Sequence, residues 1–160
     1  MQEFTSKDMF LLQDKLRQKN KTLSLAESCT GGLVASKITS ISGSSDIFKG
    51  SIVTYSNHIK NKCLGVSEAC LKEYGAVSKE VVLAMLFGAK DMFEADYVLA
   101  LSGVAGPNGG SKEKPLGMVV IGLIYEEKQI INTYYFKGDR KSIQEESANT
   151  ALELLFEVLK

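Results

Sequence analysis

The stretch that decides the fold is residues 97–125, which read YVLALSGVAGPNGGSKEKPLGMVVIGLIY. Its two ends, Tyr97–Leu101 and Met118–Tyr125, are almost continuously apolar, which is typical of strands covered on both faces. Between them, Ser102–Pro115 is rich in glycine and contains both prolines of the chain. A connection of this length and composition is usually functional. The stretch therefore predicts two buried strands joined by a functional loop.

On both sides of this stretch, apolar residues recur alternately at helical and at strand spacing. We expect further strands at about 22–26, 51–55 and 130–136, and helices at about 6–19, 33–41, 57–64 and 140–159. Another helix follows its cap Ser78 and carries one apolar stripe, formed by Val82, Met85, Leu86, Ala89, Met92 and Phe93. Because strands alternate with helices and are apolar through their middles, we predict an α/β fold, a three-layer αβα sandwich with a mixed, largely parallel sheet.

The composition fits one domain. A chain of 160 residues that is 44% hydrophobic can build one substantial core. We therefore expect a single domain over residues 1–160, with an N-terminal covering helix in the segment 1–21. Nineteen basic and nineteen acidic residues cancel without a long run of either sign, so nucleic acid is not an expected partner.

The N-terminus lacks the pattern of a signal peptide, and no apolar run reaches the ~18 residues that a membrane span needs. We expect a cytoplasmic protein with no membrane partner. The single histidine, His58, restricts the chemistry further. A Ser-His or Cys-His mechanism would have to use it, and the sequence clusters no set of zinc ligands. This favours chemistry without metal and without histidine. Cys29, Cys63 and Cys70 form no CxxC pair and are expected to be reduced thiols.

Three segments stand out as candidate site motifs: AESCTGG at 26–32, GSSDIFKGSIVTYSNHIK at 43–60, and SGVAGPNGGSKEKPLG at 102–117. Together with GAVS at 75–78 and KGDR at 137–140, and in this order, they resemble the CinA C-terminal domain family over about residues 25–140. The resemblance implies an αβα domain that hydrolyses the carboxamide of nicotinamide mononucleotide to nicotinic acid mononucleotide and ammonia.

The same resemblance implies an enzyme similar to serine-lysine amidases, which needs no cofactor or metal and forms a homodimer or higher homo-oligomer. Longer members of the family carry an additional N-terminal nucleotide pyrophosphatase domain. Because only a helix is expected before the first motif, that second activity is not expected here. The rival function is a catalytically silent module that senses a pyridine nucleotide or acts in DNA uptake or the damage response.

Amide hydrolysis needs a nucleophile, a base and hydrogen-bond donors for the oxyanion. Tyr55 is expected at a strand end and Lys60 in the first turns of the next helix, so both can reach the crevice beyond the strand ends. A lysine with the ordinary pKa of ~10.4 is a poor base at neutral pH. Burial or a positive neighbour, including the pyridinium of the substrate, would have to lower the pKa of Lys60.

By resemblance, Ser45 matches the nucleophile, Lys60 the base and Tyr55 a residue that assists proton transfer. Many members carry threonine at the position of Ser102. Backbone amides near 30–32 and 105–110 are candidates to cradle the phosphate, and Arg140 is a candidate phosphate contact. The expected substrate-binding residues are Ser28, Thr30, Gly31, Gly32, Ser44, Ser102, Gly103, Ala105, Gly106 and Arg140.

Two residues leave alternatives open. Cys29 precedes an expected helix, where a thiolate has a depressed pKa, so it is the rival nucleophile. Glu27 is an acid that either orients a neighbour or interacts with the charge of Lys60. Four residues also have ordinary structural explanations. Ser44 and Ser45 fit a turn, Arg140 fits a surface residue of a first helical turn, and His58 fits an exposed position.

Overall fold

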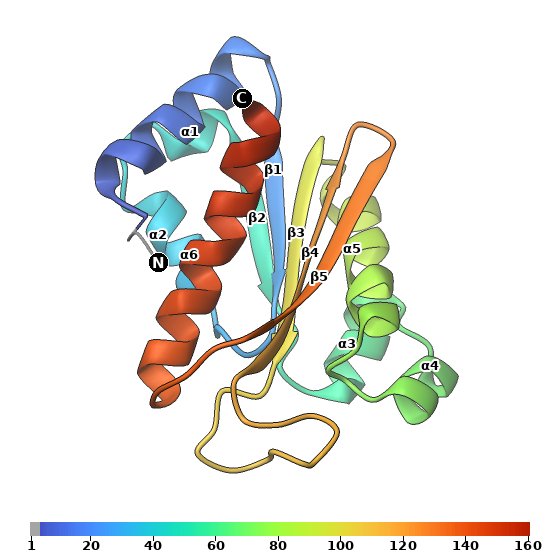
Figure 1. The fold of residues 1–160 in the computed structure, drawn as a ribbon. Coiled ribbons are helices and arrows are strands. Elements are labelled where there is room, and N and C mark those ends of the chain that lie inside the picture. The colour runs from blue at the N-terminus through green and yellow to red at the C-terminus, as the bar shows by residue number, and fades with distance from the viewer. Residues whose placement is uncertain (1–3) are drawn as a thin grey trace.

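The computed structural model describes residues 4–160 and places one five-stranded sheet between two layers of helices (Figure 1). The strands are β1 (Leu23–Glu27), β2 (Phe48–Val53), β3 (Tyr97–Gly103), β4 (Met118–Tyr125) and β5 (Lys128–Tyr135). The helices are α1 (Ser6–Gln18), α2 (Leu33–Thr39), α3 (Asn57–Leu64), α4 (Glu68–Tyr74), α5 (Lys79–Phe93) and α6 (Arg140–Leu159), with the short 3-10 turn η1 (Ser44–Asp46) before β2.

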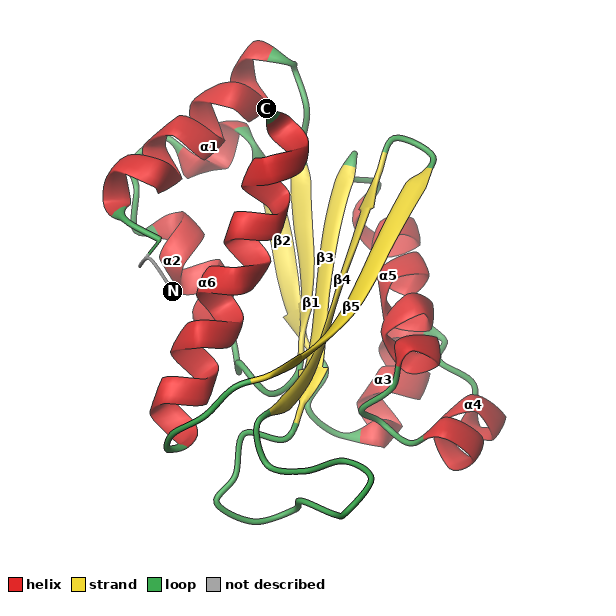
Figure 2. Ribbon diagram, in the orientation of Figure 1, coloured by secondary structure: helices red, strands yellow, loops and turns green. Residues whose placement is uncertain are grey.

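The sheet order is β2-β1-β3-β4-β5. Strand β1 pairs in parallel with β2 and with β3, whereas β4 is antiparallel to both β3 and β5. The predicted three-layer fold with a mixed sheet is confirmed, and its parallel part is the β2-β1-β3 side. Helices α1, α2 and α6 cover one face and α3, α4 and α5 cover the other (Figure 2). Of the expected covering helix in 1–21, α1 is present, and residues 1–3 lie outside the described part of the chain.

The two central strands are buried on both faces, as their apolar sequence predicts. In β3, Leu99 and Leu101 pack in the core beneath α6, while Val98 and Ala100 pack in the core beneath α5. Strand β5 forms one edge of the sheet and is only partly buried. Its alternating sequence is typical of such an edge. The two hydrophobic cores therefore share the strands of a single sheet.

Helix α5 follows its predicted cap, because the Val81 N–H donates to Ser78 Oγ at 3.2 Å. Its buried residues are Val81, Val82, Met85, Leu86 and Ala89. The prediction that Met92 lies in the core is wrong, since its side chain is exposed. Met92 lies next to the C-terminal end of α5 at Phe93, about one turn beyond Ala89, the last buried residue of the helix.

One close contact positions α3 on α5. A Cβ atom at Gly88 of α5 would overlap the backbone carbonyl of Leu64, at the C-terminal end of α3. Only a glycine lets the two helix backbones approach this closely. This packing fixes the helix that carries Lys60.

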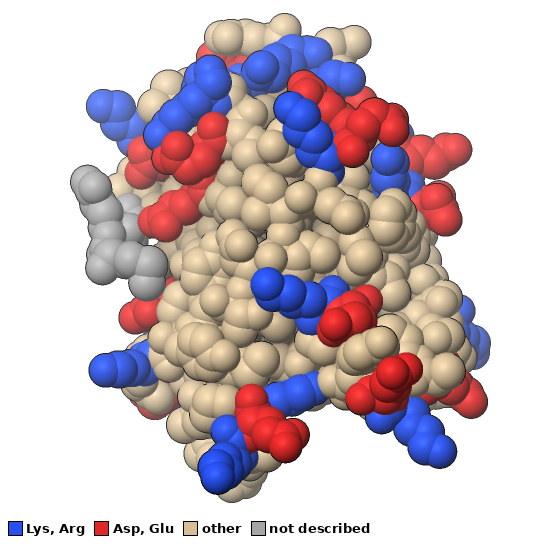
Figure 3. All heavy atoms as spheres, turned by 45° about the vertical axis from the view of Figure 1, so that its right-hand side comes forward, with Lys and Arg blue, Asp and Glu red and all other residues tan. Residues whose placement is uncertain are grey.

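No helix among residues 4–160 is long and apolar enough to cross a membrane. On the face that Figure 3 shows, basic and acidic side chains are interspersed around an uncharged central area. Within the same residues, no group of three or more His, Cys, Asp and Glu side chains is arranged to hold a metal ion.

Candidate active site

The carboxyl ends of the three parallel strands meet at one edge of the sheet, where open α/β sheets bind ligands. Ser28 directly follows β1, and Thr54 and Tyr55 directly follow β2. The long loop 104–117 leaves the carboxyl end of β3 and extends below this edge (Figure 1). Helix α3 begins here because Ser56 accepts a hydrogen bond from the Ile59 N–H at 3.2 Å.

Lys60 is buried at this edge. Only 1% of its surface is exposed, and its Nζ donates to Thr54 O at 2.7 Å, Ser28 Oγ at 3.1 Å and Tyr55 O at 3.4 Å. Burial lowers the pKa of Lys60 from its ordinary value. All three acceptors are neutral oxygens. The expectation that burial could prepare Lys60 as a base agrees with this arrangement.

Ser28 is the hydroxyl that faces Lys60. Its backbone N–H donates to Leu101 O at 3.1 Å, and its carbonyl accepts from the Gly31 N–H at 3.0 Å. The side chain is 7% exposed. Ser28 was expected only to line the site, yet the structure gives it the contact that a nucleophile makes with its base. The sequence signal that could have indicated this role is the position of Ser28 directly after a parallel strand, where open α/β sheets bind ligands.

Ser45 lies at the other end of the sheet, so the prediction that it works with Lys60 is wrong. Ser45 is exposed in η1, which leads into the amino end of β2, whereas Tyr55 follows the carboxyl end. The six residues of β2 separate the two positions and span roughly 20 Å at about 3.3 Å per residue. Ser44 does not bind substrate there either, since its Oγ donates within its own turn to Ile38 O at 2.9 Å and to Ile41 O.

The structure also contradicts Cys29 as the rival nucleophile. Its side chain is buried in the core beneath α6, and this burial raises the pKa of the Cys29 thiol to about 12. A thiol of this pKa is almost entirely protonated at neutral pH and is inert as a nucleophile. The Cys29 carbonyl accepts from Gln144 Nε2 at 2.8 Å, which ties this loop to α6.

Glu27 orients the loop after β1, which is one of the two roles the sequence left open. Successive strand residues point to opposite faces, so Glu27 faces α2 whereas Ser28 faces α3. The buried carboxylate accepts five hydrogen bonds, from Thr30 Oγ1 (2.7 Å), Gly32 N (3.1 Å), Val34 N (3.1 Å), Ala35 N (2.9 Å) and Ser51 Oγ (3.4 Å).

These bonds overturn the expectation that the amides of Gly31 and Gly32 cradle a phosphate. The Gly31 N–H donates to Ser28 O, and the Gly32 N–H donates to Glu27. At the start of α2, the Leu33 N–H donates to Thr30 O at 3.1 Å and the Val34 and Ala35 N–H groups donate to Glu27, so none of the three is free for an anion. The Thr30 hydroxyl also donates to this carboxylate.

Arg140 joins three segments at the edge of the site. One guanidinium nitrogen donates to Tyr55 Oη at 2.7 Å and the other to Gly106 O at 2.5 Å. Arg140 is therefore more than a surface residue of the first turn of α6. Tyr55 is 59% exposed, so its ring and the Arg140 guanidinium are accessible to a ligand.

The remaining predicted residues surround this edge. The Ser102 hydroxyl donates to Ala76 O at 2.7 Å, which leaves only its acceptor lone pairs for a ligand. A Cβ at Gly103 would overlap Met118 and Val119 of β4, so this glycine allows close strand pairing. Ala105 is buried. Lys114 Nζ donates to Tyr74 O and holds the far side of the long loop against α4.

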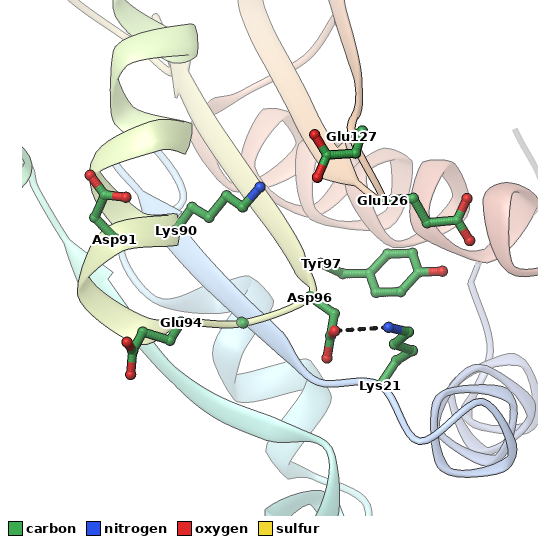
Figure 4. A pocket seen from close by; sticks show the side chains of 9 residues that line it. Lys21, Lys90, Asp91, Glu94, Asp96, Tyr97, Glu126 and Glu127 are labelled. Atoms are coloured by element: carbon green, nitrogen blue, oxygen red, sulfur yellow. Dashed lines mark hydrogen bonds and ion pairs between the residues drawn. The ribbon is translucent and has the colours of Figure 1, made fainter.

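Two cavities lie at opposite ends of the sheet. One of about 470 Å³ adjoins the Ser28 loop and is lined by Thr30, Gly31, Gly32, Leu33, Ser36, Lys141, Gln144 and Glu145. The other, of about 510 Å³, lies at the amino end of β3 and contains the Lys21–Asp96 ion pair (Figure 4). The second cavity is remote from Lys60, because Tyr97, which lines it, begins the strand that ends at Gly103.

The chain is thus an α/β protein of the αβα sandwich class, with a buried lysine bonded to a serine at the carboxyl ends of its parallel strands. The family model for the CinA C-terminal domain matches residues 7–159, and the chain belongs to this family.

The relatives agree with this assignment. The chain is 51% identical over 148 residues to a CinA-like protein of Prochlorococcus marinus (strain MIT 9312). The matched region covers 91% of this chain and 35% of that protein. It is 47% identical over 145 residues to a CinA-like protein of Thermotoga maritima, with the same shares covered. The chain thus spans about a third of the length of these curated relatives.

Solved structures show the same fold. The competence/damage inducible protein CihA from Agrobacterium tumefaciens superposes with a TM-score of 0.89 at 35% identity, with 100% of both chains covered. A competence or damage-inducible protein from Enterobacter asburiae gives a TM-score of 0.92 at 28% identity, covering 96% of this chain and 97% of that chain.

Proposed function

We propose that this chain is an amidohydrolase that deamidates nicotinamide mononucleotide, with Ser28 as nucleophile and Lys60 as base. The observation that carries the proposal is the 3.1 Å contact between Ser28 Oγ and the buried Lys60 Nζ. The choice of substrate rests on the resemblance to the CinA C-terminal domain family.

The contacts of Lys60 explain how it would act as a base. Two of its three acceptors are backbone carbonyls, of Thr54 and Tyr55, and a carbonyl can only accept. When the amine is neutral, its two hydrogens satisfy these carbonyls and its lone pair is left for Ser28. The Ser28 hydroxyl then donates to Nζ, which is the polarity that proton abstraction requires.

The reaction follows in two balanced halves. Lys60 takes the proton of Ser28 as Oγ attacks the carboxamide carbon, and the resulting ammonium returns the proton to the departing nitrogen, which leaves as ammonia. Water then attacks the ester on Ser28 and gives its proton to Lys60. Collapse of this second intermediate releases the carboxylic acid, and the Lys60 ammonium returns its proton to Ser28 Oγ, which restores the hydroxyl.

A donor for the oxyanion is available beside the nucleophile. Across residues 4–160, no protein oxygen accepts a hydrogen bond from the Thr30 N–H. A free backbone N–H two residues after the nucleophile is suited to stabilise the negative charge of a tetrahedral intermediate. We assign this role to the Thr30 backbone rather than to its side chain.

The anionic phosphate is assigned to Arg140. Its fixed positive charge lies beside the exposed Tyr55, and a guanidinium is suited to bind phosphate oxygens. Because the amides at the start of α2 are already used by Glu27, they do not compete for this role.

The test is ammonia release from nicotinamide mononucleotide by wild type, Ser28→Ala, Lys60→Met and Ser45→Ala. We expect the first two variants to lose at least about 1,000-fold in kcat, because the nucleophile and the base act as a unit. Ser45→Ala is the matched control, since its serine lies at the other end of the sheet, and it should retain wild-type kcat. Full activity of Ser28→Ala would contradict the mechanism.

The rival function is a non-catalytic module that either binds a pyridine nucleotide or acts in competence or the damage response. The names of the solved relatives mention competence and damage. Tight binding of nicotinamide mononucleotide without ammonia release by the wild type would favour it. The homodimer or higher oligomer, the cytoplasmic location and the lack of a nucleic-acid partner stay predictions.

A further inference from the structure

Glu27 has no part in the proton transfers described above, yet it is the most heavily hydrogen-bonded side chain near them. Its two carboxylate oxygens accept five hydrogen bonds, and its side chain is fully buried. We propose that Glu27 is the positioning residue of the site: its carboxylate fixes the loop 28–32 so that Ser28 Oγ meets Lys60 Nζ. This inference rests on the proposed function.

The hydrogen bonds close the loop from both of its ends. Glu27 precedes the loop, while its partners Gly32, Val34 and Ala35 follow it. Residues 28–31 are thereby held between two ends of fixed separation. Ser51 of β2 adds a donor from the neighbouring strand.

The local backbone makes this anchor necessary. Gly32, at the N-terminal cap of α2, has a left-handed φ of 100° and no side chain with which to cap the helix. The N–H groups of Val34 and Ala35 would lack partners without Glu27. Thus a carboxylate from the preceding strand replaces the cap that the helix cannot supply itself.

The charge on Glu27 matters as well as its length. A carboxylate can accept at both oxygens, whereas a glutamine must present an NH2 group at one of them. If the NH2 group replaced Oε1, it would face the Ala35 N–H. If it replaced Oε2, it would face the N–H groups of Gly32 and Val34. Glu27→Gln therefore keeps the shape of the side chain and forces one donor against another.

The chain offers a matched control at the opposite end of the sheet. Asp96 accepts from Thr22 N at 2.9 Å, Thr22 Oγ1 at 3.0 Å and Lys21 Nζ at 3.0 Å, so it also anchors a strand end through its carboxylate. It directly precedes β3, whereas Ser28 directly follows β1, so the two lie at opposite ends of these parallel strands. Figure 4 shows Asp96 paired with Lys21. Asp96→Asn should lower the thermal midpoint and leave kcat unchanged.

The experiment measures kcat and KM for ammonia release from nicotinamide mononucleotide, together with amide hydrogen exchange of residues 29–32, in wild type, Glu27→Gln and Asp96→Asn. For Glu27→Gln we expect kcat to fall about 100-fold with little change in KM, since a misplacement of about 1 Å costs this much. Amide exchange in 29–32 should accelerate in Glu27→Gln and stay as in the wild type in Asp96→Asn.

Each other outcome overturns one specific claim. If Glu27→Gln keeps the kcat and the amide exchange of the wild type, the positioning role is wrong. If the wild type itself releases no ammonia, the proposed function fails, and amide exchange alone decides the role of Glu27. If Glu27→Gln does not fold, Thr30→Val serves instead, because it removes one donor to Glu27 and keeps the Thr30 backbone N–H. Thr30→Val should also lower kcat. An unchanged kcat in Thr30→Val would overturn the inference.

Discussion

Lys60 carries an amine into a buried position where all of its partners are neutral oxygens. Because burial favours the neutral form, the folded protein holds the pKa of Lys60 below its value in the unfolded chain. At any pH between these two values the unfolded chain binds a proton that the folded protein does not. One residue thus couples the base chemistry to the stability of the fold.

This coupling predicts two pH dependences. The kcat/KM should rise with pH as Lys60 loses its proton, with a midpoint below the ordinary value of 10.5. The free energy of unfolding should also rise from pH 7 towards 10.5 in the wild type when it is compared with Lys60→Met. The reason is that burying the charged amine costs free energy, and this cost disappears as the amine loses its proton. Initial rates and urea unfolding curves across this range measure both.

A flat or falling difference in unfolding free energy between wild type and Lys60→Met would contradict the lowered pKa. Thr22→Ala, at the remote end of β1, is a suitable control because it removes no buried amine, and its difference from the wild type should not follow the titration of Lys60.

Among the elements, α3 carries Lys60, the proposed base, and the position of α3 depends on α5. Gly88→Ala should destabilise the protein by about 1–3 kcal/mol, the usual cost of overpacking, because the added methyl group would overlap the Leu64 carbonyl. The obstacle is a backbone atom, so α3 itself must shift and kcat should fall as well.

The control is Phe87→Ala, an exposed change on the same helix. It should leave the free energy of unfolding within about 0.5 kcal/mol of that of the wild type. Urea unfolding and kcat measure these effects; an unchanged kcat in Gly88→Ala would show that α3 does not need this contact.

Most elements could be predicted from the sequence because their apolar residues follow a clear period. Helix α3 begins and ends as expected, and so do β4 and α6. Helix α4 was missed because its seven residues bury only Leu71, which leaves no period to detect. The first strand-loop-helix motif was placed correctly, but the occupation of its amides by Glu27 depends on side-chain directions that no spacing reveals.

The candidate site was predicted in part. Lys60, Tyr55 and Arg140 lie at the predicted edge, together with Ser28, which had been given a minor role. Ser45 was chosen because its motif precedes Tyr55 and Lys60 in the same segment. A strand runs between them, however, and a strand carries its two ends far apart. Ser28, more distant in sequence, reaches Lys60 through the pairing of β1 with β2.

At the scale of the whole molecule, the two hydrophobic cores lie on opposite faces of one sheet and share its strands. We therefore expect residues 4–160 to unfold as one cooperative unit. Leu99→Ala, which opens a cavity beneath α6, should lower the free energy of unfolding by about 2–5 kcal/mol. The far-UV circular dichroism and the tyrosine fluorescence should shift to the same new midpoint.

Two separate transitions in the Leu99→Ala variant would contradict this expectation, because they would show that the layers of α6 and α5 unfold independently. Val98→Ala provides the matched change beneath α5. It should shift the same single transition, by a smaller amount because it removes two side-chain carbons whereas Leu99→Ala removes three.

The opposite orientations of Glu27 and Ser28 matter for anyone who wishes to redesign this protein. Adjacent residues control different properties: Glu27, the last residue of β1, holds the loop through its hydrogen bonds, and Ser28, directly after the strand, faces Lys60 as the proposed nucleophile. A variant library aimed at new amide substrates should therefore leave Glu27 constant and randomise the α3 side of the strand edge. A deletion of one residue in β1 reverses the face to which the following strand residues point, so it would turn Glu27 away from the α2 amides that it holds.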